Sequence, residues 1–128
     1  MESRIIYIAG YGRSGSTLLD IILSNAEGGF TLGEISNVFQ ERKKTTDDFY
    51  ANILSHTIHK LKLSEKEIVK IRKADRSPKL YDKNYSRFWK TFCNGIEENE
   101  EILFFIDSSK TTWQTLFRPY NLAKSFSK

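Results

Sequence analysis

Two short, continuous apolar runs stand near the two ends of the chain. Residues 5–9 (IIYIA) and 102–106 (ILFFI) are both followed by a polar or glycine-rich turn. Runs of this length are typical of strands that are covered on both faces, as in parallel sheets. Residues 30–32 are expected to form a brief extended piece between them.

Helical patterns fill most of the remaining chain. From Ser16 the apolar positions predict a largely buried helix that ends near Gly28 and Gly29. Ser64-Glu65-Lys66-Glu67 has the spacing of a capping box. Further helices are expected over residues 35–42, 47–61 and 81–95. Another is expected to run from residue 65 and to stop at Pro78, and a last one spans residues 113–126, with Pro119 as a candidate break. Two buried strands separated by helices predict a parallel α/β sheet.

Composition narrows the class of protein. The 128 residues fit one domain or a piece of one, and 39% of them are hydrophobic, enough for a globular core. Arg4 and the break at Gly10 exclude a signal peptide core, and no apolar stretch approaches the roughly 18 residues that span a membrane. A cytoplasmic protein without a membrane segment is therefore expected.

Charge and metal-binding residues exclude other classes. The net charge of +4 suits an anionic small ligand, while the mixing of both signs argues against nucleic-acid binding. The single Cys93 excludes an internal disulfide and is expected to be a half-buried packing residue. His56 and His59 are expected on the surface, with no metal site, and residues 60–76 are expected to form a solvated basic face.

The turn after the first strand has the spacing of a phosphate-binding loop. Residues 10–17 read GYGRSGST, close to the P-loop pattern GxxxxGK[ST]. Its glycines allow backbone N–H groups to converge on an anion, and the next helix adds its N-terminal N–H groups. Arg13 supplies a charged fork for oxyanions. Ser16 replaces the lysine of nucleotide-hydrolysing P-loops, which weakens the case for ATP; a turn without a ligand is the alternative.

The segment IIYIAGYGRSGSTLLD resembles the 5′-phosphosulfate loop of the sulfotransferase family, which uses PAPS (3′-phosphoadenosine 5′-phosphosulfate) and no metal. The resemblance implies a P-loop NTPase-like, three-layer α/β/α fold with a parallel sheet. It also implies that the 5′-phosphate and the sulfuryl group are bound in the loop over residues 10–19. The implied ligand-binding residues there are Gly12, Arg13, Ser14, Gly15, Ser16 and Thr17.

Two further segments contribute to the predicted site. The run DSSKTTWQTLFRPYNLAK resembles a segment of bacterial sulfotransferase-domain proteins. In that resemblance Lys110 contacts the sulfuryl or bridging oxygen, and Ser108 or Ser109 stabilises the loop. Both serines are also among the cofactor-binding residues that the resemblance implies. The alternative is that Asp107 and the serines cap a helix and that Lys110 is solvated.

Leu32-Gly33-Glu34 resembles the Gly-Glu of the tyrosylprotein branch of the family, which makes Glu34 the candidate base for a hydroxyl acceptor. The alternative is a glutamate placed in a helix first turn by the helix dipole. The acceptor, whether a small molecule or a glycan, and the oligomeric state cannot be read from the residues.

The resemblance covers only the N-terminal part of the family's domain. The region 35–98 matches only in helical character, and the family's next strand, which holds the 3′-phosphate, has no counterpart before Lys128. We therefore expect a C-terminally incomplete fold with an uncovered apolar face, poor stability alone and weak or no activity. Two other hypotheses are a degenerate P-loop kinase or NTPase, with Asp107 as a metal ligand, and a non-catalytic anion-binding remnant.

Overall fold

Three short strands form one parallel sheet, with the last strand of the sequence in the middle. The computed structural model describes residues 4–9, 16–40, 48–98, 101–109 and 115–126. Strand β3 (Phe104–Asp107) pairs on one side with β1 (Ile5–Tyr7) and on the other with β2 (Gly29–Gly33). The predicted parallel α/β architecture is confirmed, and the extended piece at residues 30–32 is a full member of the sheet.

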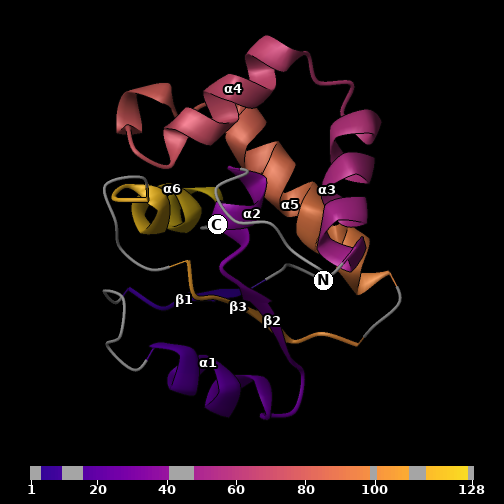
Figure 1. The fold of residues 1–128 in the computed structure, drawn as a ribbon, viewed down its shortest axis with the longest axis vertical. Helices are drawn as coiled ribbons and strands as arrows, with labels where there is room; N and C mark the ends of the chain where they lie inside the picture. The colour runs from indigo at the N-terminus through magenta and orange to yellow at the C-terminus, as the bar shows by residue number, and fades with distance from the viewer. Residues whose placement is uncertain (1–3, 10–15, 41–47, 99–100, 110–114, 127–128) are drawn as a thin grey trace.

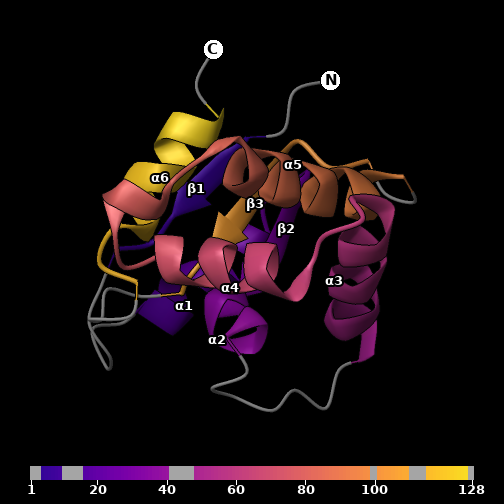
Figure 2. The same cartoon turned by 90° about the horizontal axis from the view of Figure 1, so that it is seen from above.

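Helices lie on both faces of this sheet (Figure 1, Figure 2). Helix α1 (Ser16–Ser24) connects β1 to β2 on one face, whereas all later helices lie on the other. The first crossover passes β3 to reach β2, and the second returns from β2 to β3 over the opposite face. The two crossovers therefore have the same hand, as is usual for parallel strands.

The helices of the second face begin at recognisable caps. Ser64 and Glu67 form the predicted capping box, and Asp82 accepts hydrogen bonds from two backbone N–H groups at the next helix start. The helices are α2 (Ile35–Phe39), α3 (Asp48–Lys60), α4 (Glu65–Ala74), the 3-10 helix η1 (Pro78–Leu80), α5 (Lys83–Glu97) and α6 (Arg118–Phe126).

Neither proline acts as the sequence pattern predicted. Helix α4 ends at Ala74, so Pro78 begins the following 3-10 helix instead of stopping α4. Pro119 does not break a helix, because α6 begins only at Arg118 and places Pro119 in its first turn. A proline is tolerated there because the N–H group that it lacks would have no partner within the helix.

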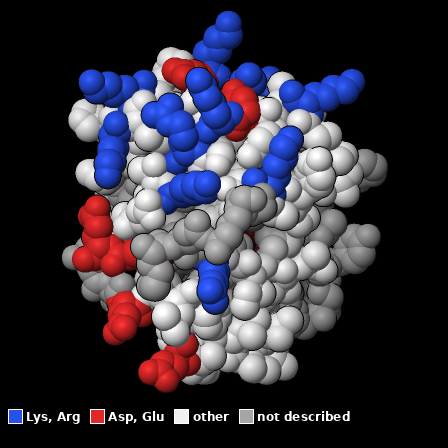
Figure 3. Space-filling view, turned by 180° about the vertical axis from the view of Figure 1, so that it is seen from behind, with Lys and Arg blue, Asp and Glu red and all other residues white. Residues whose placement is uncertain are grey.

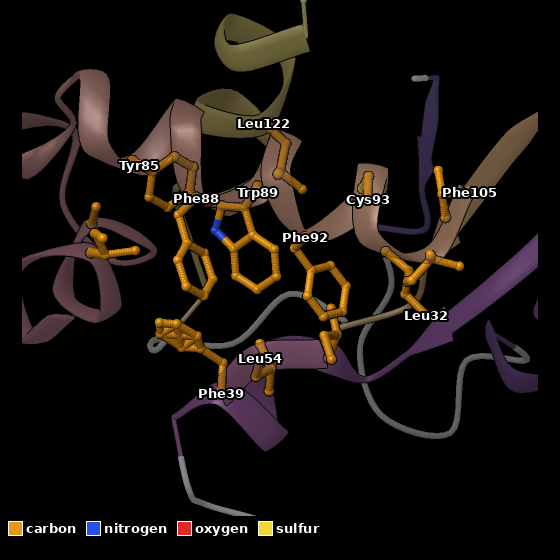
Figure 4. Close-up of a cluster of buried hydrophobic side chains, with 14 of the residues drawn as sticks. Leu32, Phe39, Leu54, Tyr85, Phe88, Trp89, Phe92, Cys93, Phe105 and Leu122 are labelled. Atoms are coloured by element: carbon orange, nitrogen blue, oxygen red, sulfur yellow. The ribbon is translucent and has the colours of Figure 1, made fainter. Parts of the chain in front are cut away.

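Helix α5 supplies the centre of the hydrophobic core (Figure 4). Its inward side chains pack against β2 and β3, α2 and α6, and those below 3% exposure are Tyr85, Phe88, Trp89, Phe92, Cys93 and Ile96. Cys93 is completely buried, not half-buried as predicted, and burial raises the pKa of its thiol above the usual value. The two histidines are exposed, as predicted.

Helix α1 is present as predicted, but its predicted burial is wrong. Leu18, Leu19, Ile21 and Ile22 are 63%, 44%, 53% and 58% exposed. Ile6 of β1 is also exposed. The small sheet thus leaves an apolar surface uncovered on the α1 side, as expected for three strands.

We expect charged residues on this α1 surface to reduce self-association. The variant Leu18→Glu/Ile22→Lys replaces two exposed apolar side chains with an i, i+4 ion pair, so stability should change by less than about 0.5 kcal/mol. Light scattering at rising concentration should show less association than in the parent chain. Tyr120→Glu, at a residue of α6 that is 58% exposed, is the control. Equal association in all three proteins would contradict this expectation.

Candidate functional site

The three strands end in register at one edge of the sheet. Tyr7 and Gly33 both pair with Asp107, and the N–H group of Ile8 donates to the Asp107 carbonyl at 2.9 Å. On the other side, the Ser108 N–H group donates to the Gly33 carbonyl at 2.9 Å. The segments that follow all three strands therefore leave from the same edge, where open α/β sheets bind their ligands.

The predicted phosphosulfate loop lies partly outside the described residues. The predicted residues Gly12, Arg13, Ser14, Gly15 and Lys110 fall in residues 10–15 and 110–114, which lie outside the described residues. Helix α1 begins at Ser16, directly after the predicted loop, so Ser16 and Thr17 are its first two residues. Its first turn contains no acidic residue that would compensate the partial positive charge of this helix end.

Ser108 belongs to a buried polar cluster that links α1 to the sheet. The Asp20 carboxylate accepts hydrogen bonds from the Ser108 hydroxyl at 2.6 Å and from the Thr31 hydroxyl at 3.0 Å, both through Oδ2. Asp20 is 8% exposed, and within the described part of the chain its buried Oδ1 has no hydrogen-bond partner. Ser108 therefore uses its only proton on Asp20, so in this arrangement it can offer a ligand only lone pairs.

Ser109 connects the ends of β3 and β2. Its backbone N–H group donates to the Asp107 carboxylate at 2.9 Å, and its hydroxyl accepts a hydrogen bond from the Ser36 N–H group at 3.1 Å. Both contacts are buried. Ser109 thus fixes the start of α2 relative to β3, and a direct role in ligand binding stays a prediction for both serines.

Arg118, for which the sequence pattern predicted no role, lies completely buried behind this edge. Its Nε and Nη2 donate to Asp107 Oδ2 at 3.0 and 2.7 Å, and its Nη1 donates to both Asp75 carboxylate oxygens at 3.0 and 3.1 Å. One guanidinium therefore bridges two buried carboxylates. Burial alone would lower the pKa of Arg118, but the charges of Asp107 and Asp75 raise it well above its usual value.

Neutral donors and an aromatic ring complete the surroundings of this ion triad. Asp75 also accepts hydrogen bonds from the Tyr85 hydroxyl at 2.6 Å and the Ser36 hydroxyl at 2.7 Å. The Arg118 guanidinium lies 4.2 Å from the centroid of the Trp89 ring. Two negative charges thus face one positive charge, and the additional donors offset the difference.

The sequence pattern carries no clear signal for Arg118. The helix predicted over residues 113–126 places Arg118 in mid-helix, and only the structure shows it in the first turn of α6, where a cation opposes the helix dipole. Nothing in the sequence pattern indicates that Asp75 and Asp107 are its partners, and Asp75 lies at the end of a basic segment.

Glu34 lies at the same edge, directly before α2. It occupies the N-cap position of this five-residue helix but makes no side-chain capping bond, and its side chain is partly exposed. Gly33, which precedes it, has a φ of +55°, a conformation that favours glycine. Because Glu34 precedes α2 as its N-cap residue, it does not lie within the first turn of the helix, which was the alternative. The role of Glu34 as a base stays a prediction.

Asp107 is poorly suited to the alternative role of metal ligand. Its Oδ2 is bound by Arg118 and its Oδ1 by the Ser109 N–H group. Within the described ranges, no group of three or more His, Cys, Asp or Glu residues could hold a metal ion. Asp107 itself ends β3, and the capping alternative for Asp107 and the serines stays a prediction, because residues 110–114 lie outside the described residues.

Among the described residues, no helix is both long and apolar enough to cross a membrane.

Comparisons with known proteins assign no family or function to the chain. No protein-family model, no curated protein and no solved structure matches it.

Proposed function

We propose that the chain carries the 5′-phosphosulfate-binding part of a PAPS-dependent sulfotransferase with a P-loop NTPase-like fold. The observation that carries this proposal is the common edge of the parallel sheet. There, β1 ends beside the ends of β2 and β3, and in the sequence the segment GYGRSGST connects β1 to α1. A helix N-terminus after such a turn is suited to an anion.

The charges of the sequence support an anion at this place. In the sequence, Arg13 comes after β1, and Lys110 comes after the two serines that follow β3, so both cations belong to segments that continue from strands ending at the shared edge. Asp20 and Asp107 lie buried behind it, and Arg118 compensates the charge of Asp107. Arg13 and Lys110 are therefore the cations on which anion binding depends in this proposal.

The proposed reaction transfers the sulfuryl group to a hydroxyl of a small molecule or a glycan. The acceptor oxygen forms a bond to sulfur while the bond between sulfur and the bridging phosphate oxygen breaks. Glu34 takes the acceptor proton, and Lys110 neutralises the charge that grows on the leaving phosphate. No metal takes part in these steps.

Substitution of Arg13 tests the binding step. We expect metal-independent binding of adenosine 5′-phosphosulfate in calorimetry, and a loss of roughly tenfold or more for Arg13→Ala, because one charge-assisted contact is removed. Arg4→Ala removes an exposed cation before β1 and is the control, expected to bind as the parent does. Adenosine 5′-phosphosulfate is the suitable probe because it lacks the 3′-phosphate, for which this chain shows no predicted site.

Two results would contradict this proposal. Unchanged affinity in Arg13→Ala would show that the glycine-rich turn is structural. Binding of ATP that requires Mg²⁺ and exceeds that of the phosphosulfate would favour the kinase or NTPase hypothesis instead.

A further inference from the structure

The charges of the chain are concentrated on one part of the fold that the proposed site does not use. Residues 60–90 contain 11 Lys and Arg and 4 Asp and Glu, a net charge of +7, whereas the whole chain has +4. The rest of the chain is therefore net negative. Figure 3 shows Lys and Arg gathered over the upper part of one face, with a few acidic residues among them, and further acidic residues at its lower left.

Six of these cations form two regular stripes, which we call the basic stripes. Lys66, Lys70 and Lys73 recur at i, i+4 and i+7 on α4, and Lys83, Arg87 and Lys90 recur at the same spacing on α5. This spacing places each set along one side of its helix, and all six residues are exposed. Lys70 and Asp82 form an ion pair at 3.0 Å that connects α4 to the start of α5.

Folding does not explain the stripe on α5. Lys83 and Arg87 are four residues apart and Arg87 and Lys90 are three apart, and like charges at these two spacings destabilise a helix. Lys83 also stands at the N-terminal end of α5, where the helix dipole disfavours a cation. Helix α5 contains no acidic residue before Glu97. Within the described part of the chain, Lys70 is the only member of the basic stripes that forms an ion pair. An ordinary solvated helix alternates its charges, so this arrangement points to an external anionic partner.

We propose that the basic stripes bind the surface of an anionic lipid bilayer. Five of the six cations are lysines, which act as flexible point charges, whereas base and phosphate recognition in nucleic acids favours the planar fork of arginine. Helix α4 has no aromatic residue, and the four aromatic side chains of α5 are buried, so the stripes offer no ring on which a base could stack. Val69, 44% exposed between Lys66 and Lys73, adds an apolar contact typical of interfacial helices.

Vesicle sedimentation with the full chain tests the proposal. We expect binding to phosphatidylcholine vesicles that contain about 30% phosphatidylserine, at least roughly tenfold stronger than to pure phosphatidylcholine, since each cation near such a surface adds about fivefold. Because the Debye length falls from about 30 Å at 0.01 M salt to about 8 Å at 0.15 M, binding should weaken over this range.

Matched variants distinguish the effect of the basic stripes on vesicle binding from the effect of net charge alone. Lys83→Gln/Arg87→Gln/Lys90→Gln should lose about tenfold or more in vesicle binding. The control Arg4→Gln/Asn25→Asp/Ala26→Glu makes the same net-charge change at exposed positions outside α4 and α5, and should lose less than about threefold. Lys66→Gln/Lys73→Gln provides a second, independent test on α4. Circular dichroism should show that the α5 variant melts no lower than the parent.

Three outcomes would overturn the proposal. One is equal binding to vesicles with and without phosphatidylserine, and another is an equal loss in the stripe and control variants. The third is tighter binding of duplex DNA than of the anionic vesicles at the same salt concentration, which would assign the stripes to nucleic acid. None of these results depends on phosphosulfate binding at the sheet edge.

Discussion

Arg118→Ala should destabilise the protein by about 3–5 kcal/mol, because it leaves two buried carboxylates without their shared counter-ion. Asp75 is 2% exposed and Asp107 is completely buried, so water cannot replace the guanidinium without opening the core. A loss of this size is a large share of the 5–15 kcal/mol that stabilises a typical domain. Urea unfolding followed by circular dichroism measures it.

Two control variants distinguish the cost of breaking the buried ion triad from the cost of removing an arginine in general. Arg87→Ala removes an exposed guanidinium from α5 and should change stability by less than about 0.5 kcal/mol. Arg118→Met combined with Asp75→Asn and Asp107→Asn removes all three charges and should recover part of the loss. A cost below about 1 kcal/mol for Arg118→Ala would show that the triad is not closed to solvent.

Trp89→Ala should cost about 3–5 kcal/mol, because it opens a cavity at the centre of the aromatic core. The Trp89 ring centroid lies 5.1 Å from that of Phe88, 5.4 Å from that of Phe39 and 5.5 Å from that of Phe92. The Arg118 guanidinium loses the ring beneath it in the same variant. Thermal and urea unfolding of the purified variant measure the loss.

Trp89→Phe is the informative comparison. The Trp89 Nε1 atom is buried and has no hydrogen-bond partner among the described residues, so phenylalanine removes an unsatisfied donor while it keeps an aromatic ring. We expect this variant to lose less than about 1.5 kcal/mol. If it is as unstable as Trp89→Ala, then Nε1 makes a contact that matters for stability.

Local signals in the sequence were sufficient for most elements of the fold. The apolar runs at residues 5–9 and 102–106 predicted β1 and β3, and the Ser64–Glu67 capping box predicted the start of α4. The full role of β2 was missed because its sequence, GFTLG, has two glycines and little apolar periodicity. Gly29 is needed there for close packing, since a Cβ atom would lie 2.8 Å from the Leu23 carbonyl oxygen.

The candidate site was predictable only in part. Parallel strands bring their carboxyl ends together, so the sequence could predict that the segments after β1 and β3 share an edge. The Asp75–Arg118–Asp107 triad depends on how α4 and α6 pack against the sheet, which no local pattern encodes. The exposure of Leu18 and Ile22 has the same origin, because an apolar helix is buried only where a neighbouring element covers it.

The central position of β3 has a consequence for synthesis of the chain. Among the described strands, β1 and β2 pair only with β3, and Ile5 pairs with Phe105, which lies far along the sequence from it. On the ribosome, the first two strands therefore remain without a sheet until β3 has emerged. Such high contact order slows folding, and during this interval the nascent chain presents its apolar segments to chaperones.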